Sequence, residues 1–452
     1  MSDIDPVEKT ESQLKALSAA LETGTIRHAS RMLNELNPAE IADLLESLPY
    51  SERNLLWDLV DPEKEGEVLL EVGDEVRTTL IRDMPLENLV NATEGMDVDD
   101  LADFVQSLPD KVTSEVLTSL DTQRRRRLET VLSYPEDSAG GLMNTDTITV
   151  RPEVTLDIVL RYLQRLGELP SNTDNLIVTT RDNRYIGVLP LTTLLTSDPQ
   201  SYVVDVMNRE IEAIPAETED DNVARIFEDY DLLSAPVVDE QMKLLGRITV
   251  DDVVDVIRDE GDHSVMGMAG LSEEEDLFAP VIPSSRRRAL WLGINLITAF
   301  MASWVVSNFE TTLEKVVAIA VLMNIVASMG GIAGTQTLTL VTRGLALGQV
   351  SRQNRAWLMS KELIVGMLNG MVWAIVVGGI AFLWFKQANI GIVIAAAMII
   401  NLIIAALSGA AIPLILRKLG IDPAIAGSVV VTTVTDIVGL FVFLGLATMF
   451  LL

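Results

Sequence analysis

The chain has 452 residues, no cysteine and a formal net charge of −31, and this length is enough for two or three domains. The lack of cysteine excludes disulfides, thiolate metal sites and cysteine nucleophiles, and the negative charge argues against nucleic acid as a partner. Residues 286–452 hold 5 acids and 11 bases, so 60 of the 65 acids and 23 of the 34 bases precede them. The first part is therefore −37 and the second +6, and we expect cations to gather on the first part.

Residues 1–133 are predicted to form an all-α domain, because apolar residues recur at three- and four-residue spacing between prolines. The segment Ile41–Pro49 (IADLLESLP) returns sixty residues later as Leu101–Pro109 (LADFVQSLP), which indicates stacked repeats in a small superhelix. Chance similarity between two amphipathic helices is the alternative. The acidic start, Met1–Pro6, lacks the basic and apolar regions of a signal peptide, so we expect a cytoplasmic N-terminus.

Residues 134–200 and 201–258 are predicted to be two α/β units, because β-branched runs alternate with helical stretches in the same order twice. The expected strands are 147–150, 176–180 and 185–189 in the first unit and 213–214, 235–238 and 244–249 in the second, with helices at 156–166, at 221–227 and from Asp251 onward. Met143 and Met207 precede the first expected strand of each unit at matching places. This pattern resembles a tandem CBS domain pair, a module that usually senses ligands rather than performing catalysis.

Residues 259–285 are predicted to be an acidic connecting helix and a linker. Asp259, Glu260 and Asp262 continue the last helix of the α/β pair, and Glu273–Asp276 is followed by Pro280 and Pro283.

Residues 286–452 are predicted to be a membrane domain of five helices. The apolar runs are 289–309, 316–342, 363–385, 387–416 and 424–451, and each can cross a bilayer. Basic residues before the first run, between the second and third and between the fourth and fifth follow the positive-inside rule. We therefore expect a multi-pass protein of the inner or plasma membrane, with the acidic part inside and the C-terminus outside.

The last run contains a lone carboxylate, Asp436. A charged side chain at the centre of a membrane helix costs about 3 kcal/mol, so it usually faces a partner, a water-filled cavity or a cation. On a helix, Ser428, Thr432, Thr435 and Gly439 share its face and form a polar stripe. We interpret the stripe as part of a pore for a hydrated divalent cation such as Mg²⁺, with two chains around a two-fold axis supplying two carboxylates. For the hydroxyls alone, bonding back to their own helix is the simpler alternative.

A second group lies in the second apolar run, where Gly330, Gly331 and Gly334 precede Gln336. Such glycines allow either close helix packing or a broken helix with free carbonyls. We predict that Gly330, Gly331 and Gln336 lie next to the pore.

The third group is the acidic residues of the soluble part, including Asp97, Asp99 and Asp100. Most acids of this kind form a solvated face. Where they face one another across a boundary, their repulsion would be relieved by divalent cations, which would make a cation-sensitive switch.

Two other functions are alternatives to a channel. An intramembrane aspartyl hydrolase needs two neighbouring carboxylates, and only Glu362 and Asp422, both near membrane boundaries, are available as partners for Asp436 within one chain. A CBS-bearing sensor without transport would leave the polar stripe unexplained. We therefore expect no enzyme activity.

Taken together, these segments resemble the MgtE family of magnesium channels over nearly the whole chain. The most specific matches are Tyr134–Met143, Gly330–Gln336, Lys361-Glu362 and Asp422–Asp436. The resemblance implies a homodimeric Mg²⁺ channel in which Asp436 binds the permeating ion and intracellular Mg²⁺ closes the gate. The candidate regulatory ligands are Asp100, Asp252, Asp255, Asp259, Glu260, Asp262 and Asp422.

This sequence departs from the family pattern at three places. Asn324 and Ser428 stand where the family usually has proline, and Ile332 stands where it has asparagine. CBS pairs also often hold adenosine with an aspartate three residues after a threonine. Thr249 and Asp252 supply that pattern in the second unit, whereas the first unit has Pro190 and Thr193, so ATP is a candidate ligand at one site.

Overall fold

The computed structural model describes residue 15 and residues 26–452, apart from residues 83, 94, 109 and 273–274. Met1–Pro6, Pro109 and Glu273-Glu274, which entered the predictions above, lie outside the described residues. The chain divides into two compact units. The first contains the residues up to Glu260 together with Glu274–Pro280, and the second contains Gly261–Glu273 and Val281–Leu452.

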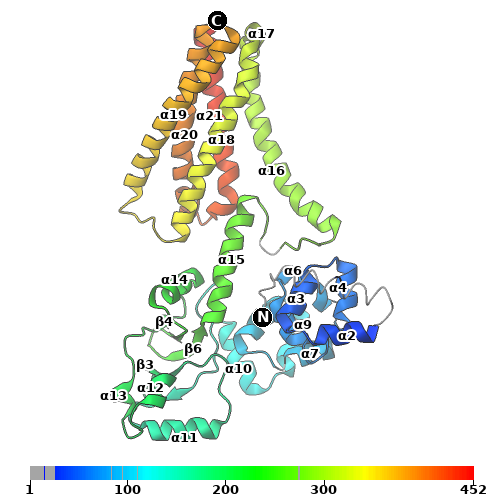
Figure 1. The fold of residues 1–452 in the computed structure, drawn as a ribbon, viewed down its shortest axis with the longest axis vertical. Coiled ribbons are helices and arrows are strands. Elements are labelled where there is room, and N and C mark those ends of the chain that lie inside the picture. Colours follow the sequence, from blue (N-terminus) through cyan, green and yellow to red (C-terminus); the bar gives the residue numbers. More distant parts are fainter. Residues whose placement is uncertain (1–14, 16–25, 83, 94, 109, 273–274) are drawn as a thin grey trace. The chain divides into compact units, whose positions relative to one another are not determined.

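Short helices form the first part of the first unit (Figure 1). They are α2 (Ile26–Asn34), α3 (Pro38–Glu46), α4 (Tyr50–Trp57), α5 (Glu65–Glu71), α6 (Asp74–Arg82), α7 (Leu86–Thr93), α8 (Val98–Gln106), α9 (Asp110–Ser119) and α10 (Thr122–Val131). Alternate helices pack together, α3 on α5, α5 on α7 and α7 on α9, as in a stacked solenoid. Helices α3 and α8 bury equivalent positions, Ile41, Ala42, Leu44 and Leu45 in one and Leu101, Ala102, Phe104 and Val105 in the other, which supports the repeat.

Two three-stranded sheets follow, as the alternation of strands and helices predicted. The strands are β1 (Thr149–Val150), β2 (Asn175–Thr179) and β3 (Tyr185–Pro190), then β4 (Ile214–Pro215), β5 (Ser234–Val238) and β6 (Leu244–Thr249). In both sheets the first pair of strands is parallel and the second antiparallel. The helices beside them are α11 (Leu156–Leu166), α12 (Leu191–Thr196), α13 (Val203–Val206) and α14 (Asp220–Tyr230).

Each sheet is joined to the segment that leads into the other. The Asn144 amide, ahead of the first sheet, donates to Arg247 O of β6 (2.7 Å), and the Asn208 amide, ahead of the second, donates to Val188 O of β3 (2.7 Å). Gly246 and Gly187 permit this approach, since a Cβ on either would lie 2.6 Å from the carbonyl oxygen of the crossing asparagine. Backbone hydrogen bonds in both directions therefore hold the pair together.

Helix α15 (Val250–Met268) follows β6 directly and runs without a break past residue 258. The connecting segment thus continues the last helix of the second α/β unit, as the sequence predicted, and the boundary between the two compact units falls within this helix, after Glu260. One helix carries both segments.

The second unit is built on α16 (Val281–Ser307), α17 (Glu310–Lys315), α18 (Val317–Ala346), α19 (Arg355–Phe385), α20 (Ala388–Lys418) and α21 (Pro423–Leu451). All of these except α17 are long and apolar enough to cross a membrane, as predicted. Helix α16 begins within the stretch expected to be linker, because Pro283 is tolerated in a first turn where its missing N–H is not needed. Helix α20 is central and packs against α18, α19 and α21 (Figure 1). Helix α16 contacts α21.

Candidate functional site

A cavity of about 1070 Å³ lies along α18 and α21. One face of α18 and two residues of α21 form its lining, which consists of Asn324, Ala327, Ser328, Gly331, Ile332, Thr335, Gln336, Thr339, Leu340, Thr432 and Asp436. The α18 residues recur every three or four positions, as expected for one side of a helix. Most of them are small or polar, which suits a water-filled space better than contact with lipid.

Asp436 is the one charged residue in this lining. Among the described residues, its carboxylate forms no hydrogen bond and no ion pair. A carboxylate in a membrane helix without a counter-charge from the protein is costly, and a hydrated divalent cation in the cavity would offset that cost.

The hydroxyls of the predicted stripe separate into two groups. Thr432 lines the cavity, and its Oγ1 donates to Ser428 O (2.8 Å), so its lone pairs stay available to an ion or its waters. Thr435 is fully buried, and its Oγ1 donates to Thr432 O (3.0 Å). Ser428 donates to Met268 O of α15 (3.2 Å). Of the hydroxyls in the stripe, only Thr432 lines the cavity beside Asp436. Thr432 and Thr435 both bond back to their own helix, as in the simpler interpretation, whereas Ser428 contacts α15.

The glycines of α18 also separate. Gly331 and Gln336 line the cavity. Gly330 and Gly334 serve close packing instead, since an added Cβ would lie 2.3 Å from Asn401 Nδ2 of α20 and 2.6 Å from Val431 Cγ1 of α21, respectively. Helix α18 is continuous from Val317 to Ala346, so the glycines do not break it.

At the start of α21, both carboxylate oxygens of Asp422 have protein partners. Oδ1 accepts the Ala424 amide (2.8 Å) and so caps the helix, while Oδ2 lies 2.6 Å from His263 Nε2 of α15. Asp422 was a candidate regulatory metal ligand. A metal ion at Asp422 would share these two oxygens with His263 and the Ala424 amide.

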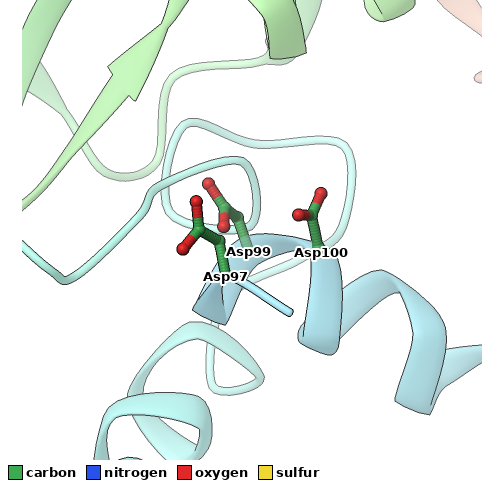
Figure 2. Close-up of side chains that lie close together, drawn as sticks. All are labelled: Asp97, Asp99 and Asp100. Atoms are coloured by element: carbon green, nitrogen blue, oxygen red, sulfur yellow. The ribbon is translucent and has the colours of Figure 1, made fainter. Parts of the chain in front are cut away.

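A cluster of acids lies in the first unit at the start of α8. Carboxylate oxygens of Asp97, Asp99 and Asp100 come within 4.8 Å of one another (Figure 2). Asp99 is 7% exposed, and Asn144 Nδ2 donates to its Oδ1 (3.2 Å). Burial, reinforced by the negative charges of Asp252 and Asp100, raises the pKa of Asp99 to about 8.

Neighbouring carboxyl groups are shifted in the same direction. Burial, with the nearby charges of Asp97 and Asp251, raises the pKa of Asp100 to about 6. Burial and the Asp251 charge raise the pKa of Asp252 to about 7, and burial with the Glu136 charge raises that of Asp103 to about 7. Like charges held this close favour protons or a divalent cation between them.

The sequence predictions named Asp100 and Asp252 from this group but not Asp99 or Asp103 as ligands. The close spacing of Asp99, Asp100 and Asp103 on one helix could have indicated a shared site. The sequence does not show, however, that Asp99 is buried against Asn144. Of the other candidates, Asp255, Asp259 and Asp262 are exposed on α15. Asp255 contributes to raising the pKa of Glu71 of α5, after the larger effect of burial, and Asp259 pairs with Arg258 at 3.8 Å. Glu260 is partly exposed on the same helix.

The candidate nucleotide residues are in contact. Thr249 Oγ1 donates to Asp252 Oδ2 (3.0 Å), which also accepts the Thr249 amide (3.2 Å). The Asp252 carboxylate thus accepts hydrogen bonds from Thr249 and also lies close enough to Asp99 and Asp100 of α8 for their negative charges to repel one another.

The fold and this cavity define a multi-pass membrane protein with a CBS-containing soluble part. The family model described as "Divalent cation transporter" (MgtE) matches residues 323–446, the "MgtE intracellular N domain" matches 36–137, and the CBS domain matches 139–198 and 203–259. The magnesium transporter MgtE of Thermus thermophilus is 30% identical over 96% of this chain and 98% of its own length, and that of Bacillus subtilis is 28% identical over 95% and 96%. The chain belongs to the MgtE family.

A solved structure, the cytosolic domain of the Mg²⁺ channel MgtE in complex with ATP, is 32% identical with a TM-score of 0.49 and covers 54% of this chain and 99% of its own.

Proposed function

We propose that this protein is a Mg²⁺-selective channel of the inner or plasma membrane, with an ion path between α18 and α21. The observation that carries the proposal is Asp436, a carboxylate in a membrane helix that lines a large cavity without a basic partner among the described residues. Membership of a family whose relatives are named magnesium transporters identifies Mg²⁺ as the transported ion. Thr432, Gly331 and Gln336 would contact its water shell.

A second copy of the chain would complete the path. Asn324, Ser328 and Gln336 are exposed on the cavity face of α18 and have no side-chain hydrogen bond among the described residues. In a membrane, such a polar face needs a protein or water partner. A two-fold axis along this face would cover it and place two Asp436 carboxylates around one divalent ion, which balances its charge.

Intracellular Mg²⁺ would regulate the channel through the acids of α8 and α15. Burial, reinforced by neighbouring carboxylates, raises the pKa values of Asp99 and Asp252, and a divalent cation between these groups would stabilise their charged forms. The soluble part would then lie in the cytoplasm and the C-terminus outside. ATP would bind beside Thr249 and Asp252.

In the described membrane helices of one chain, the cavity lining places no second carboxylate beside Asp436, as an intramembrane aspartyl hydrolase would need. The Asp422 carboxylate contacts His263. Glu362 Oε1 accepts a hydrogen bond from Lys361 Nζ (2.8 Å), and its Oε2 accepts one from Thr337 Oγ1 (3.3 Å). Neither lines the cavity with Asp436 in the described part of the chain.

Purified protein in liposomes tests the proposal. We expect Mg²⁺ influx down its gradient, measured with a dye inside the vesicles, with Mn²⁺, Co²⁺ and Ca²⁺ as competitors. A folded protein that admits no divalent ion at any Mg²⁺ level would instead support the sensor without transport.

A further inference from the structure

Asn401 of α20 is a polar residue buried inside the membrane bundle, outside the cavity lining. Its side chain is 0% exposed, and its Nδ2 donates to Val326 O of α18 (2.7 Å). Its Oδ1 is buried without a hydrogen-bond partner among the described residues. An amide placed at such a cost needs a reason beyond filling space, because an apolar side chain of similar size would fill it without an unpaired acceptor.

The contacts of Asn401 link both helices of the cavity. On α18 it occupies the space left by Gly330, where an added Cβ would lie 2.3 Å from Nδ2. On α21 it occupies the space left by Gly439, where an added Cβ would lie 2.7 Å from Oδ1. Gly330 adjoins Gly331 of the lining, and Gly439 lies three residues, less than one turn, after Asp436. Asn401 therefore meets both cavity helices at the level of the candidate ion site.

We propose that Asn401 is a positioning residue that sets the distance between α18 and α21 at Asp436, and with it the spacing of ligands around the ion. The proposal rests on the proposed function. The hydrogen bond fixes α18, the contact with Gly439 fixes α21, and the two glycines allow one side chain to reach both backbones. Because Mg²⁺ requires stricter geometry than Ca²⁺, small changes in this spacing alter the choice between the two ions.

Transport in liposomes by Asn401→Ala and Asn401→Leu tests the proposal, with rates normalised to folded protein measured by size-exclusion chromatography. We expect both variants to keep Mg²⁺ flux but to raise the Mg²⁺ concentration for half-maximal uptake severalfold and to reduce the preference for Mg²⁺ over Ca²⁺. Unchanged affinity and ion preference in folded variants, including those that merely melt at a lower temperature, would overturn the proposal.

A paired substitution separates positioning from general packing. Gly439→Ala should impair transport because the new methyl meets Asn401, and adding Asn401→Ala should restore part of it by clearing that space. Gly445→Ala is the matched control on α21, since a Cβ there meets nothing within 4 Å. If the double variant is no better than Gly439→Ala, Asn401 does not act through this contact. Absence of Mg²⁺ flux in the unaltered protein would instead refute the proposed function itself.

Discussion

His263 Nε2 lies 2.6 Å from Asp422 Oδ2, and this contact joins the end of α15 to the beginning of α21, the helix that carries Asp436. Ser428 strengthens the same junction through its hydrogen bond to Met268 O (3.2 Å). The connecting helix thus contacts the candidate pore helix through the side chains of His263, Asp422 and Ser428. A movement of α15 would be transmitted to α21 through this junction.

We expect Asp422→Asn to weaken closure of the channel by Mg²⁺. Asparagine keeps the N-cap of α21 but removes the charge facing His263, so α15 should detach more readily. Liposome flux at high internal Mg²⁺ should be greater than in the unaltered protein. Asp422→Ala should also remove the N-cap of α21, which lowers the free energy of unfolding by about 1 kcal/mol, and should therefore lower the melting temperature. Equal inhibition by Mg²⁺ in Asp422→Asn and the unaltered protein would rule out a role for this contact in gating.

The acids around α8 predict how stability depends on pH. Burial and like charges raise the pKa values of Asp99, Asp103 and Asp252 to about 8, 7 and 7, above the ordinary value of 3.8. The folded protein therefore holds protons that the unfolded chain has released, and without Mg²⁺ its melting temperature should fall as pH rises from about 4 to about 8.

Added Mg²⁺ should abolish most of that fall, because it replaces the protons between the carboxylates. Asp99→Asn should flatten the pH profile without Mg²⁺ and reduce the stabilisation by Mg²⁺. A melting temperature that is independent of pH and of Mg²⁺ would contradict a cation site here.

Arg53 and Asp276 form a buried ion pair in the first unit. Arg53 Nη1 lies 2.7 Å from Asp276 Oδ2, with the side chains 1% and 5% exposed, and Arg53 Nε donates to Leu45 O (2.8 Å). Asp276→Ala would leave the guanidinium buried without its counter-charge, at a cost of about 3–5 kcal/mol. Hydrogen exchange in α3 and α4 should accelerate accordingly. Asp74→Ala, which removes an exposed carboxylate paired with the partly buried Arg77, is the control and should cost less than about 1 kcal/mol.

The proposed dimer predicts where cysteines will cross-link, and the absence of native cysteine makes the test clean. Ile332 lines the cavity and is 55% exposed in the single chain, so Ile332→Cys should form an intermolecular disulfide on mild oxidation. Trp373 is exposed on α19, and the Trp373→Cys variant should run as a monomer on a non-reducing gel. A reversed result would place the two-fold axis elsewhere.

Local pattern was enough to predict much of this fold. Apolar runs identified five membrane helices, and β-branched runs identified the repeated sheets, because these signals depend on neighbouring residues. Asp436 was recognisable because an acid is rare at that depth. The packing roles of Thr435 and Gly330 could not be recognised in this way. Residues on one side of a helix have the same spacing whether that side faces the cavity or a neighbouring helix. The junction of His263 with Asp422 joins positions 159 residues apart, and no local pattern reports such a contact.

The two departures at Asn324 and Ile332 do fall in the cavity lining, whereas Ser428 faces α15. The sequence alone does not show which of these three positions faces the cavity and which faces a neighbouring helix.

Mg²⁺ uptake by Asp436→Asn in liposomes, at dimer content matched to the unaltered protein, tests the central claim most directly. Asparagine keeps the shape of the side chain and removes only its charge, so the account predicts a folded protein that has lost nearly all Mg²⁺ flux. Undiminished flux through Asp436→Asn would show that the ion does not depend on this carboxylate, and the proposed path between α18 and α21 would then be wrong.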